Sequence, residues 1–210
     1  MSDFIQEMNT PKISITANNY LCINGNDGFK FDDEIVKQLL IITNNALSLQ
    51  YNANYLFDNI PSTITKLCID FPNYDNINID NLHNGLKELH ILSEDNGHFN
   101  KPINNLPPTL ERLYIESNNF NQSLDYLPCS LKNLYIESKA FDCCLDNLPP
   151  NLETLTIKVD QEPVCKTITT DNFMNLPNTL KILNVSEKYN LDINQIQNRY
   201  PNLEIYIHNI

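Results

Sequence analysis

The sequence predicts a β-rich solenoid, in which similar coils stack right-handedly and contribute their strands to one parallel sheet, with few helices. A Leu-Pro pair recurs at Leu106, Leu127 and Leu148, 21 residues apart. Within each copy the apolar residues keep the spacing LPxxLxxLxI, and the closing LxI alternates as a strand with one buried face does. A unit this short cannot bury its own apolar face, so each coil must stack on the next.

Further copies of the pattern extend the solenoid in both directions. Upstream, "IPSTITKLCI" begins at Ile60 and "LHNGLKELHI" at Leu82, and "ALSLQ" supplies a degenerate strand before them. Downstream, "LPNTLKILNV" begins at Leu176, and the chain closes on "YPNLEIYIHNI". An insertion at residues 160–173 interrupts the stack, and it is either a tolerated loop or part of a binding surface.

Residues outside the strand slots also have predicted places. Proline after the opening leucine suits a bend outside the sheet, where no ladder hydrogen bond is needed. Phe120 and Phe141 are expected to fill the far side of their coils, opposite the strands. The strands are expected to pair in parallel, about 4.8 Å apart.

The two ends of the stack need caps, because a terminal coil would expose its core. "KISITANNYLCINGNDG" alternates as a hairpin does, and "FDDEIVKQLLIITNN" predicts a capping helix near 33–43 with Asp32 or Asp33 as its N-cap. "LDINQIQNRY" predicts a short helix opened by Asp192. We therefore expect a single domain with three parts: an N-terminal cap at 1–45, a repeat solenoid at 46–199 and a C-terminal cap strand at 200–210.

Composition and charge favour a folded, intracellular protein. The formal net charge is −12, and the 14 basic residues are scattered singly, which disfavours binding to nucleic acid or to an anionic membrane surface. The start "MSDFIQEMNTPK" lacks the pattern of a secretory signal, and no apolar run is long enough for a membrane-spanning helix. We expect a cytoplasmic location, which would be the host cytoplasm for a viral protein.

The residues that usually carry chemistry form no recognisable set. The sequence lacks GxSxG, a P-loop, GxGxxG and HExxH, and its four histidines fall in different coil positions. Six cysteines form no CxxC, so reduced thiols are expected. Cys143 and Cys144 are either a redox pair or, as we favour, two small residues in a turn. The sequence predicts no enzymatic activity, no cofactor and no metal.

The repeat resembles two known classes on specific residues. "LERLYIESNNF" at 110–120 fits the LxxLxLxxNxL pattern of leucine-rich repeats, with Asn118 in the slot that normally forms an asparagine ladder. "FNKPINNLPPTL", from Phe99 to Leu110, resembles the FNIP repeat, whose mark is Phe-Asn-x-Pro-Ile followed by Leu-Pro. The resemblance covers roughly residues 60–190 and implies an α/β leucine-rich-repeat-like solenoid.

The FNIP resemblance also bears on source and role. FNIP-repeat proteins are known mainly from social amoebae and from large DNA viruses that infect amoebae. Some members carry an N-terminal F-box and look like substrate adaptors of ubiquitin ligases. The first 50 residues here do not resemble an F-box, so a ubiquitin-ligase adaptor remains an alternative rather than the leading interpretation.

Residues that flank the buried Leu and Ile of each strand should project outward and form one exposed face. Exposed Tyr and Arg are typical anchors of protein interfaces, although Tyr and Thr also stack across strands for stability alone. Two neighbouring glutamates on this face favour a basic partner surface. The candidate partner-binding residues are His90, Arg112, Tyr114, Glu116, Tyr135, Glu137, Thr156 and Tyr206.

The function that these observations favour is that of a non-enzymatic protein-interaction module. It would bind a protein partner, with no nucleic acid and no membrane, along the outer face of its strands. A structural, self-assembling repeat protein is the second alternative. The chain itself is expected to be a monomer or a weak homo-oligomer.

Overall fold

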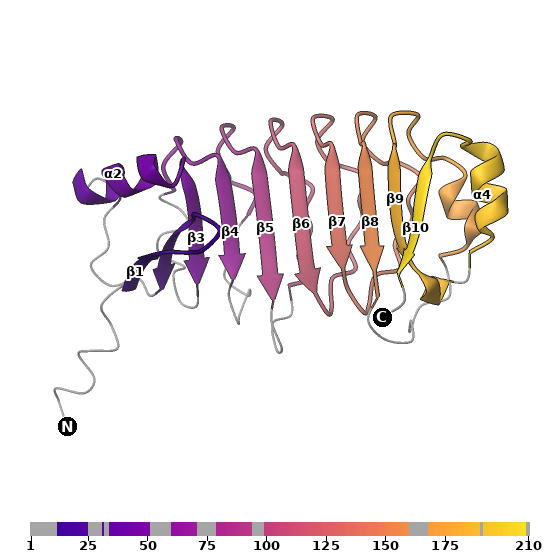
Figure 1. Cartoon of the computed structure of the whole chain (residues 1–210), viewed down its shortest axis with the longest axis horizontal. Coiled ribbons are helices and arrows are strands. Elements are labelled where there is room, and N and C mark those ends of the chain that lie inside the picture. The colour runs from indigo at the N-terminus through magenta and orange to yellow at the C-terminus, as the bar shows by residue number, and fades with distance from the viewer. Residues whose placement is uncertain are drawn as a thin grey trace, which may run out of the picture.

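The computed structural model describes residues 12–24, 31, 34–50, 60–70, 79–93, 99–159, 168–189 and 191–208. Ten strands form one sheet in chain order, from β1 to β10 (Figure 1). β1 runs antiparallel to β2, and every later strand is parallel to the one before it. This confirms the expected β-rich, leucine-rich-repeat-like solenoid. The strands are β1 (Lys12–Ile15), β2 (Leu21–Asn24), β3 (Ala46–Gln50), β4 (Lys66–Asp70), β5 (Glu88–Ser93), β6 (Arg112–Ser117), β7 (Asn133–Glu137), β8 (Thr154–Lys158), β9 (Ile182–Ser186) and β10 (Glu204–His208).

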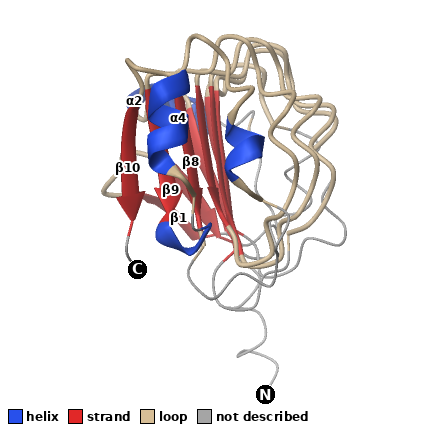
Figure 2. Cartoon of the chain, turned by 90° about the vertical axis from the view of Figure 1, so that its right-hand side faces the viewer, coloured by secondary structure: helices blue, strands red, loops and turns tan. Residues whose placement is uncertain are grey.

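The repeat slots of the sequence become columns that run across the sheet. Leu113, Leu134 and Leu155 are Cα partners from strand to strand, and the isoleucines two positions later form the next column. These side chains are buried in one continuous core. Figure 2 shows the sheet as one wall of the molecule and the loops as the other, and the core fills the space between them.

A second column, of phenylalanines, fills the loop side of the core. The rings of Phe99 and Phe120 stack with their centroids 5.9 Å apart, and those of Phe120 and Phe141 with centroids 6.2 Å apart, all nearly parallel. The buried hydroxyls of Ser117 and Ser138 donate to the carbonyls of Phe99 and Phe120, at 3.0 and 2.8 Å. The expectation that Phe120 and Phe141 fill the far side of their coils is confirmed.

A tight turn that returns the chain to the sheet begins at the proline of each Leu-Pro pair. The carbonyl of Pro107 accepts the N–H of Leu110 at 3.0 Å, and Pro128 and Leu131 repeat this bond at 3.0 Å. Each proline therefore opens a turn just before its strand, outside the ladder, as expected. Between coils, the hydroxyl of Thr109 donates to the carbonyl of Leu86 at 2.9 Å.

The asparagine of the Phe-Asn pair links each coil to the next. The Oδ1 atom of Asn100 accepts the N–H of Asn121 at 2.9 Å, and Oδ1 of Asn121 accepts the N–H of Asp142 at 3.0 Å. Asp142 continues the series by accepting the N–H of Ile168 at 3.2 Å. The ladder thus follows the phenylalanines, while the slot of Asn118 is taken by Lys139 and Asp160 in the next two copies.

The slot of the FNIP proline shows how the repeat tolerates variation. Pro102 occupies this slot in one coil, and Ser123 and Cys144 occupy it in the next two. The hydroxyl of Ser123 donates to Asp125 at 2.7 Å and accepts the N–H of Asp125 at 3.1 Å. Cys144 makes the same pair of contacts with Asp146. In these two coils, hydrogen bonds of the Ser123 and Cys144 side chains therefore hold the turn that the ring of Pro102 restrains in the preceding coil.

The N-terminal end differs in one respect from the expectation. Helix α2 (Glu34–Ile42) matches the expected capping helix and buries Val36 and Leu40 against the core. The candidate N-caps Asp32 and Asp33 lie outside the described residues. β2 pairs with β3 in register, so the expected hairpin also contributes a full member of the parallel sheet.

The C-terminal end carries short helices around β9 and β10. They are η1 (Thr170–Phe173), η2 (Glu187–Tyr189) and α4 (Ile193–Arg199). Asp192 caps α4 by accepting the N–H of Gln195 at 3.0 Å, so the expected helix opened by Asp192 is confirmed. Most of the insertion at 160–173 lies outside the described residues. The division into parts at 1–45, 46–199 and 200–210 stays a prediction.

Replacing Phe120 by alanine should strongly destabilise the fold. The ring is fully buried and stacks on two others, so its loss leaves a cavity and should lower the free energy of unfolding by about 3–5 kcal/mol. Chemical denaturation measures this. Tyr126→Ala is the control, because this ring is 67% exposed and its removal should change the free energy by less than about 0.5 kcal/mol. A loss below about 1 kcal/mol for Phe120→Ala would contradict the phenylalanine column.

Asn121→Ala should cost about 1 kcal/mol of unfolding free energy, because it removes the acceptor of the Asp142 N–H. Asn121→Asp keeps an oxygen at the same place, as Asp142 does in the next coil, and should cost less. Thermal and chemical denaturation of both variants compare the two costs. Equal destabilisation by Ala and Asp would show that the side-chain oxygen is not what matters.

Candidate functional site

The outer face of the sheet gathers most of the predicted partner-binding residues at its centre. His90, Tyr114 and Tyr135 are adjacent in register on β5, β6 and β7. Arg112 precedes Tyr114 on β6, and Glu116 and Glu137 are register partners on β6 and β7. Tyr206 lies on β10, three strands away from Tyr135. The column that contains these aromatic residues reads Cys22, Ser48, Cys68, His90, Tyr114, Tyr135, Thr156, Asn184 and Tyr206.

The rings of this column stack on one another. The centroids of His90 and Tyr114 are 5.2 Å apart with an angle of 18° between the rings, and those of Tyr114 and Tyr135 are 4.0 Å apart at 9°. The ammonium of Lys158 lies 5.3 Å from the centre of the Tyr135 ring, within cation–π range. Each aromatic pair contributes about 0.5–1.5 kcal/mol beyond the area it buries. The result is a rigid aromatic surface across β5 to β7.

Tyr20 extends this surface from the N-terminal side. Its ring meets that of His90 at 60° with centroids 6.4 Å apart, and its hydroxyl donates to Glu88 Oε1 at 3.3 Å. β3 and β4 lie between, so the ring must cross the small side chains of Ser48 and Cys68. Two small residues in successive slots were the signal that sequence reasoning missed. We call Tyr20, His90, Tyr114 and Tyr135 the aromatic ladder.

Raised pKa values keep the hydroxyl of Tyr20 and the thiol of Cys68 protonated at neutral pH. Burial, reinforced by Glu88, raises the pKa of Tyr20 well above its ordinary value. Burial also raises the pKa of Cys68 to about 11, so this thiol stays protonated at neutral pH and is a poor nucleophile. Cys68 therefore acts as a small filler beneath the ladder and not as a reactive group.

Glu88 is the electrostatic centre of the face, although the sequence pattern alone does not single it out. Its Oε2 accepts from Arg112 Nε at 3.0 Å, and its Oε1 lies 2.9 Å from His90 Nε2. Lys66 Nζ lies 3.7 Å from Glu88 Oε2, and only 12% of the Glu88 side chain is exposed. Burial by itself would raise the pKa of Glu88, but the Arg112 bond and the charges of Lys66 and His90 lower it below the ordinary value. The carboxylate therefore stays ionised and fixes Arg112.

The two central tyrosines are each tied to a glutamate on the same strand. Tyr114 donates its hydroxyl proton to Glu116 Oε2 at 3.4 Å, and Tyr135 donates to Glu137. Burial and the neighbouring glutamates raise the pKa of both tyrosines, so both hydroxyls remain donors at neutral pH. The like-charged register partners Glu116 and Glu137 are thus each held by a hydrogen bond.

Several residues that were expected to be exposed on the outer face are buried, among them Ser48 and the candidate Thr156. Thr156 is only 6% exposed, because its short side chain lies between Tyr135 and Asn184 and accepts a hydrogen bond from Asn184 Nδ2 at 2.9 Å. It cannot serve as an accessible contact. Ser186 is also buried, and its hydroxyl donates to the carbonyl of Val159 at 3.3 Å. Tyr206 is 50% exposed and donates to Glu204 at 2.9 Å.

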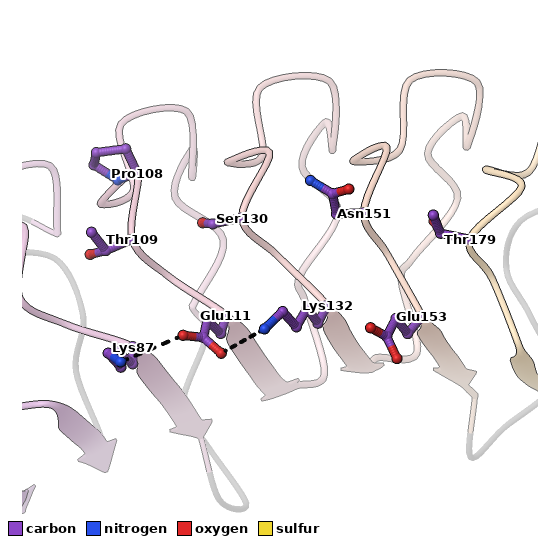
Figure 3. A pocket seen from close by; sticks show the side chains of 9 residues that line it. All are labelled: Lys87, Pro108, Thr109, Glu111, Ser130, Lys132, Asn151, Glu153 and Thr179. Carbon is purple, nitrogen blue, oxygen red and sulfur yellow. Dashed lines mark hydrogen bonds and ion pairs between the residues drawn. The ribbon is translucent and has the colours of Figure 1, made fainter.

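A second surface, which the sequence interpretation missed, lies where the strands begin. A groove of about 530 Å³ there is lined by alternating basic and acidic side chains (Figure 3). Glu111 accepts from Lys132 at 3.1 Å and pairs with Lys87 at 3.7 Å, while Lys181 pairs with Glu153 at 2.6 Å. The bond from Lys132 lowers the pKa of Glu111. Because the charges neutralise one another, the groove presents no field of one sign, and such exposed pairs chiefly link neighbouring coils.

Other candidate chemistry finds no support in the part of the chain that the structure describes. These residues contain no cluster of metal-ligating side chains and no disulfide, while His98 and Cys165 lie outside them. The thiol of Cys144 donates to Asp146 within its turn, and Cys143 contacts Asn121. Among the described helices none has the length and apolar character needed to cross a membrane.

Glu88→Gln should destabilise the protein in a pH-dependent way. The folded pKa of Glu88 is lower than the unfolded one, so its contribution is fully present above the unfolded value and is lost as the pH falls through the folded value. The difference in unfolding free energy between wild type and Glu88→Gln should be largest near pH 7 and should shrink below about pH 4. Denaturation at several pH values measures it, and a difference that grows on acidification would contradict the role of the carboxylate.

Part of the chain matches the model of a known repeat. Residues 120–158, from Phe120 to the end of β8, match the model of the FNIP repeat. No curated protein matches the chain. A crystal structure of CroV588, described as a novel circular LRR protein, is similar at 20% sequence identity with a TM-score of 0.43; the match covers 83% of this chain and 28% of that one.

The match to the FNIP repeat is compatible with a repeat-type interaction module in general and identifies no partner. Repeats of this kind generally form interaction modules rather than enzymes, and stacked coils provide extended binding surfaces. The resemblance first suggested by the Phe-Asn-x-Pro-Ile motif is confirmed, and the chain carries FNIP repeat sequence at residues 120–158 within a leucine-rich-repeat-like solenoid.

Proposed function

We propose that the chain is a non-enzymatic protein-interaction module that binds a protein partner across the outer face of its sheet. The aromatic ladder carries this proposal. It joins Tyr20, which directly precedes β2, to β5, β6 and β7 on a face where α2 and α4 lie only at the two ends of the sheet (Figure 1). Tyrosine and arginine anchor protein interfaces because they offer a large contact area and hydrogen bonds together.

The ladder is organised before any partner arrives. Stacking fixes the rings, the Tyr114 and Tyr135 hydroxyls are tied to glutamates, and Glu88 holds Arg112. Immobilising a flexible side chain on binding costs about 0.5–1.5 kcal/mol, and here much of that cost is met during folding. A partner therefore meets a surface whose contact groups already have one conformation.

The chemistry of the face favours a basic partner. Glu116 and Glu137 lie side by side next to the tyrosine rings, and the chain as a whole has a net charge of −12. Lys158 already shows that a cation is accommodated over the Tyr135 ring. A lysine or arginine of the partner would meet the hydroxyls and ring edges of the tyrosines beside a carboxylate.

Affinity capture from amoebal cytosol, read by mass spectrometry, tests the proposal. Wild type should capture a protein that the Tyr114→Ala/Tyr135→Ala variant loses, with binding weakened at least tenfold, which equals about 1.4 kcal/mol. Tyr126→Ala is the matched control, because it removes an equally large tyrosine that is exposed outside the strands. It should retain the partner.

The outcomes separate the possible roles. Equal capture by wild type and the double variant, with both folded by circular dichroism, would contradict binding through the ladder. Loss of the partner in Tyr126→Ala would move the binding surface to the loop side. Binding that persists unchanged in 1 M salt would count against a basic partner, since exposed charge pairs are screened over about 3 Å at that ionic strength.

A further inference from the structure

The outermost strand of the described sheet at its C-terminal end, β10, has an edge with which no described strand pairs. It pairs with β9 on one side, and its sequence is Glu-Ile-Tyr-Ile-His. Edge strands of this length are usually blocked by proline, by an inward-pointing charge or by a bulge, because they otherwise template pairing with another chain. β10 carries none of these devices.

The backbone N–H and C=O groups of β10 point alternately toward β9 and toward the open edge. The N–H of Glu204 donates to the carbonyl of Lys181 at 2.9 Å, so Glu204 directs its backbone groups toward β9. Successive residues of a strand alternate between the two edges. Tyr206 and His208 therefore also direct their backbone groups toward β9, and Ile205 and Ile207 direct theirs toward the open edge.

The inward-facing side chains of β10 extend the apolar core one strand beyond β9. Ile205 and Ile207 are in register with the buried Leu183 and Val185 of β9. Ile207 is nevertheless 49% exposed, and Tyr206 on the other face is 50% exposed. The two isoleucines thus offer an apolar surface at the place where their own backbone groups lack a strand partner among the described residues.

We propose that β10 pairs antiparallel with β10 of a second copy of this chain, about a two-fold axis at Tyr206. In this register Ile205 of one copy lies opposite Ile207 of the other, and these pairs exchange their N–H···O=C bonds. Tyr206 lies opposite Tyr206 as the closer, non-hydrogen-bonded pair. The two sheets would join into one continuous sheet with a continuous apolar core.

Charge complementarity selects a second copy and this register. With Tyr206 at the axis, Glu204 of each copy lies opposite His208 of the other, on the outer face. A shift by two residues in either direction loses an isoleucine pair and both Glu204–His208 pairs. Such an interface is isologous and closes at two copies. Pairing β10 with β1 of another copy would instead be head-to-tail and would not close at two copies.

Sedimentation velocity of the full chain over a range of concentrations tests the proposal. We expect a reversible monomer–dimer equilibrium that stops at the dimer. Ile207→Lys places a charge in the apolar edge and should abolish the dimer, while the exposed position lets the monomer fold, as circular dichroism would show. Ile13→Lys on β1 is the matched control and should leave the dimer intact.

A charge exchange tests the register. Glu204→Lys places Lys opposite His208 and should raise the dissociation constant about tenfold, and adding His208→Glu should restore it, because the pair is then reversed. A monomer at every concentration, species larger than a dimer, loss of the dimer in Ile13→Lys, or no rescue by the double exchange would each overturn the proposal. The aromatic ladder is untouched by these variants, so the outcome is independent of the proposed partner binding.

Discussion

The constraint on which this molecule depends is that a short coil cannot bury its own apolar face. Each coil must lie on the next in register, so residues that occupy the same slot become neighbours through the whole stack. The leucine, isoleucine and phenylalanine columns are the direct result, and they form one core without a break. The same constraint turns polar slots into ladders, as with Asn100, Asn121 and Asp142.

The outer face inherits its properties from this constraint. Tyr114 and Tyr135 stack because the repeat places them side by side on strands about 4.8 Å apart. That stacking stabilises the sheet, and the same contact holds the rings of the proposed binding surface in place. Stability of the sheet and presentation of the rings therefore have one cause, and the proposal of a basic partner rests on the acidic groups beside the rings.

The sequence predicted the elements that recur in every repeat, and it missed side-chain contacts that span several repeats. Period and alternation were sufficient for the strands and their register, and helical spacing with candidate N-cap residues was sufficient for α2 and the helix opened by Asp192. Tyr20 could not be found this way, because it belongs to the N-terminal hairpin and reaches Glu88 over two intervening strands. The burial of Thr156 depends on the sizes of its neighbours, and the ladder of Asn100 and Asn121 depends on loop geometry that the repeat period does not describe.

The central claim is that partners meet the aromatic ladder and not the loops or the charged groove. Hydroxyl-radical footprinting of the chain, alone and with a captured partner, tests this most directly, because it reports the solvent access of individual side chains. The account predicts that oxidation of Tyr114 and Tyr135 falls in the complex while that of Tyr126 is unchanged. Protection of Tyr126 or of the groove lined by Lys87 and Glu111, with the ladder still fully reactive, would contradict it.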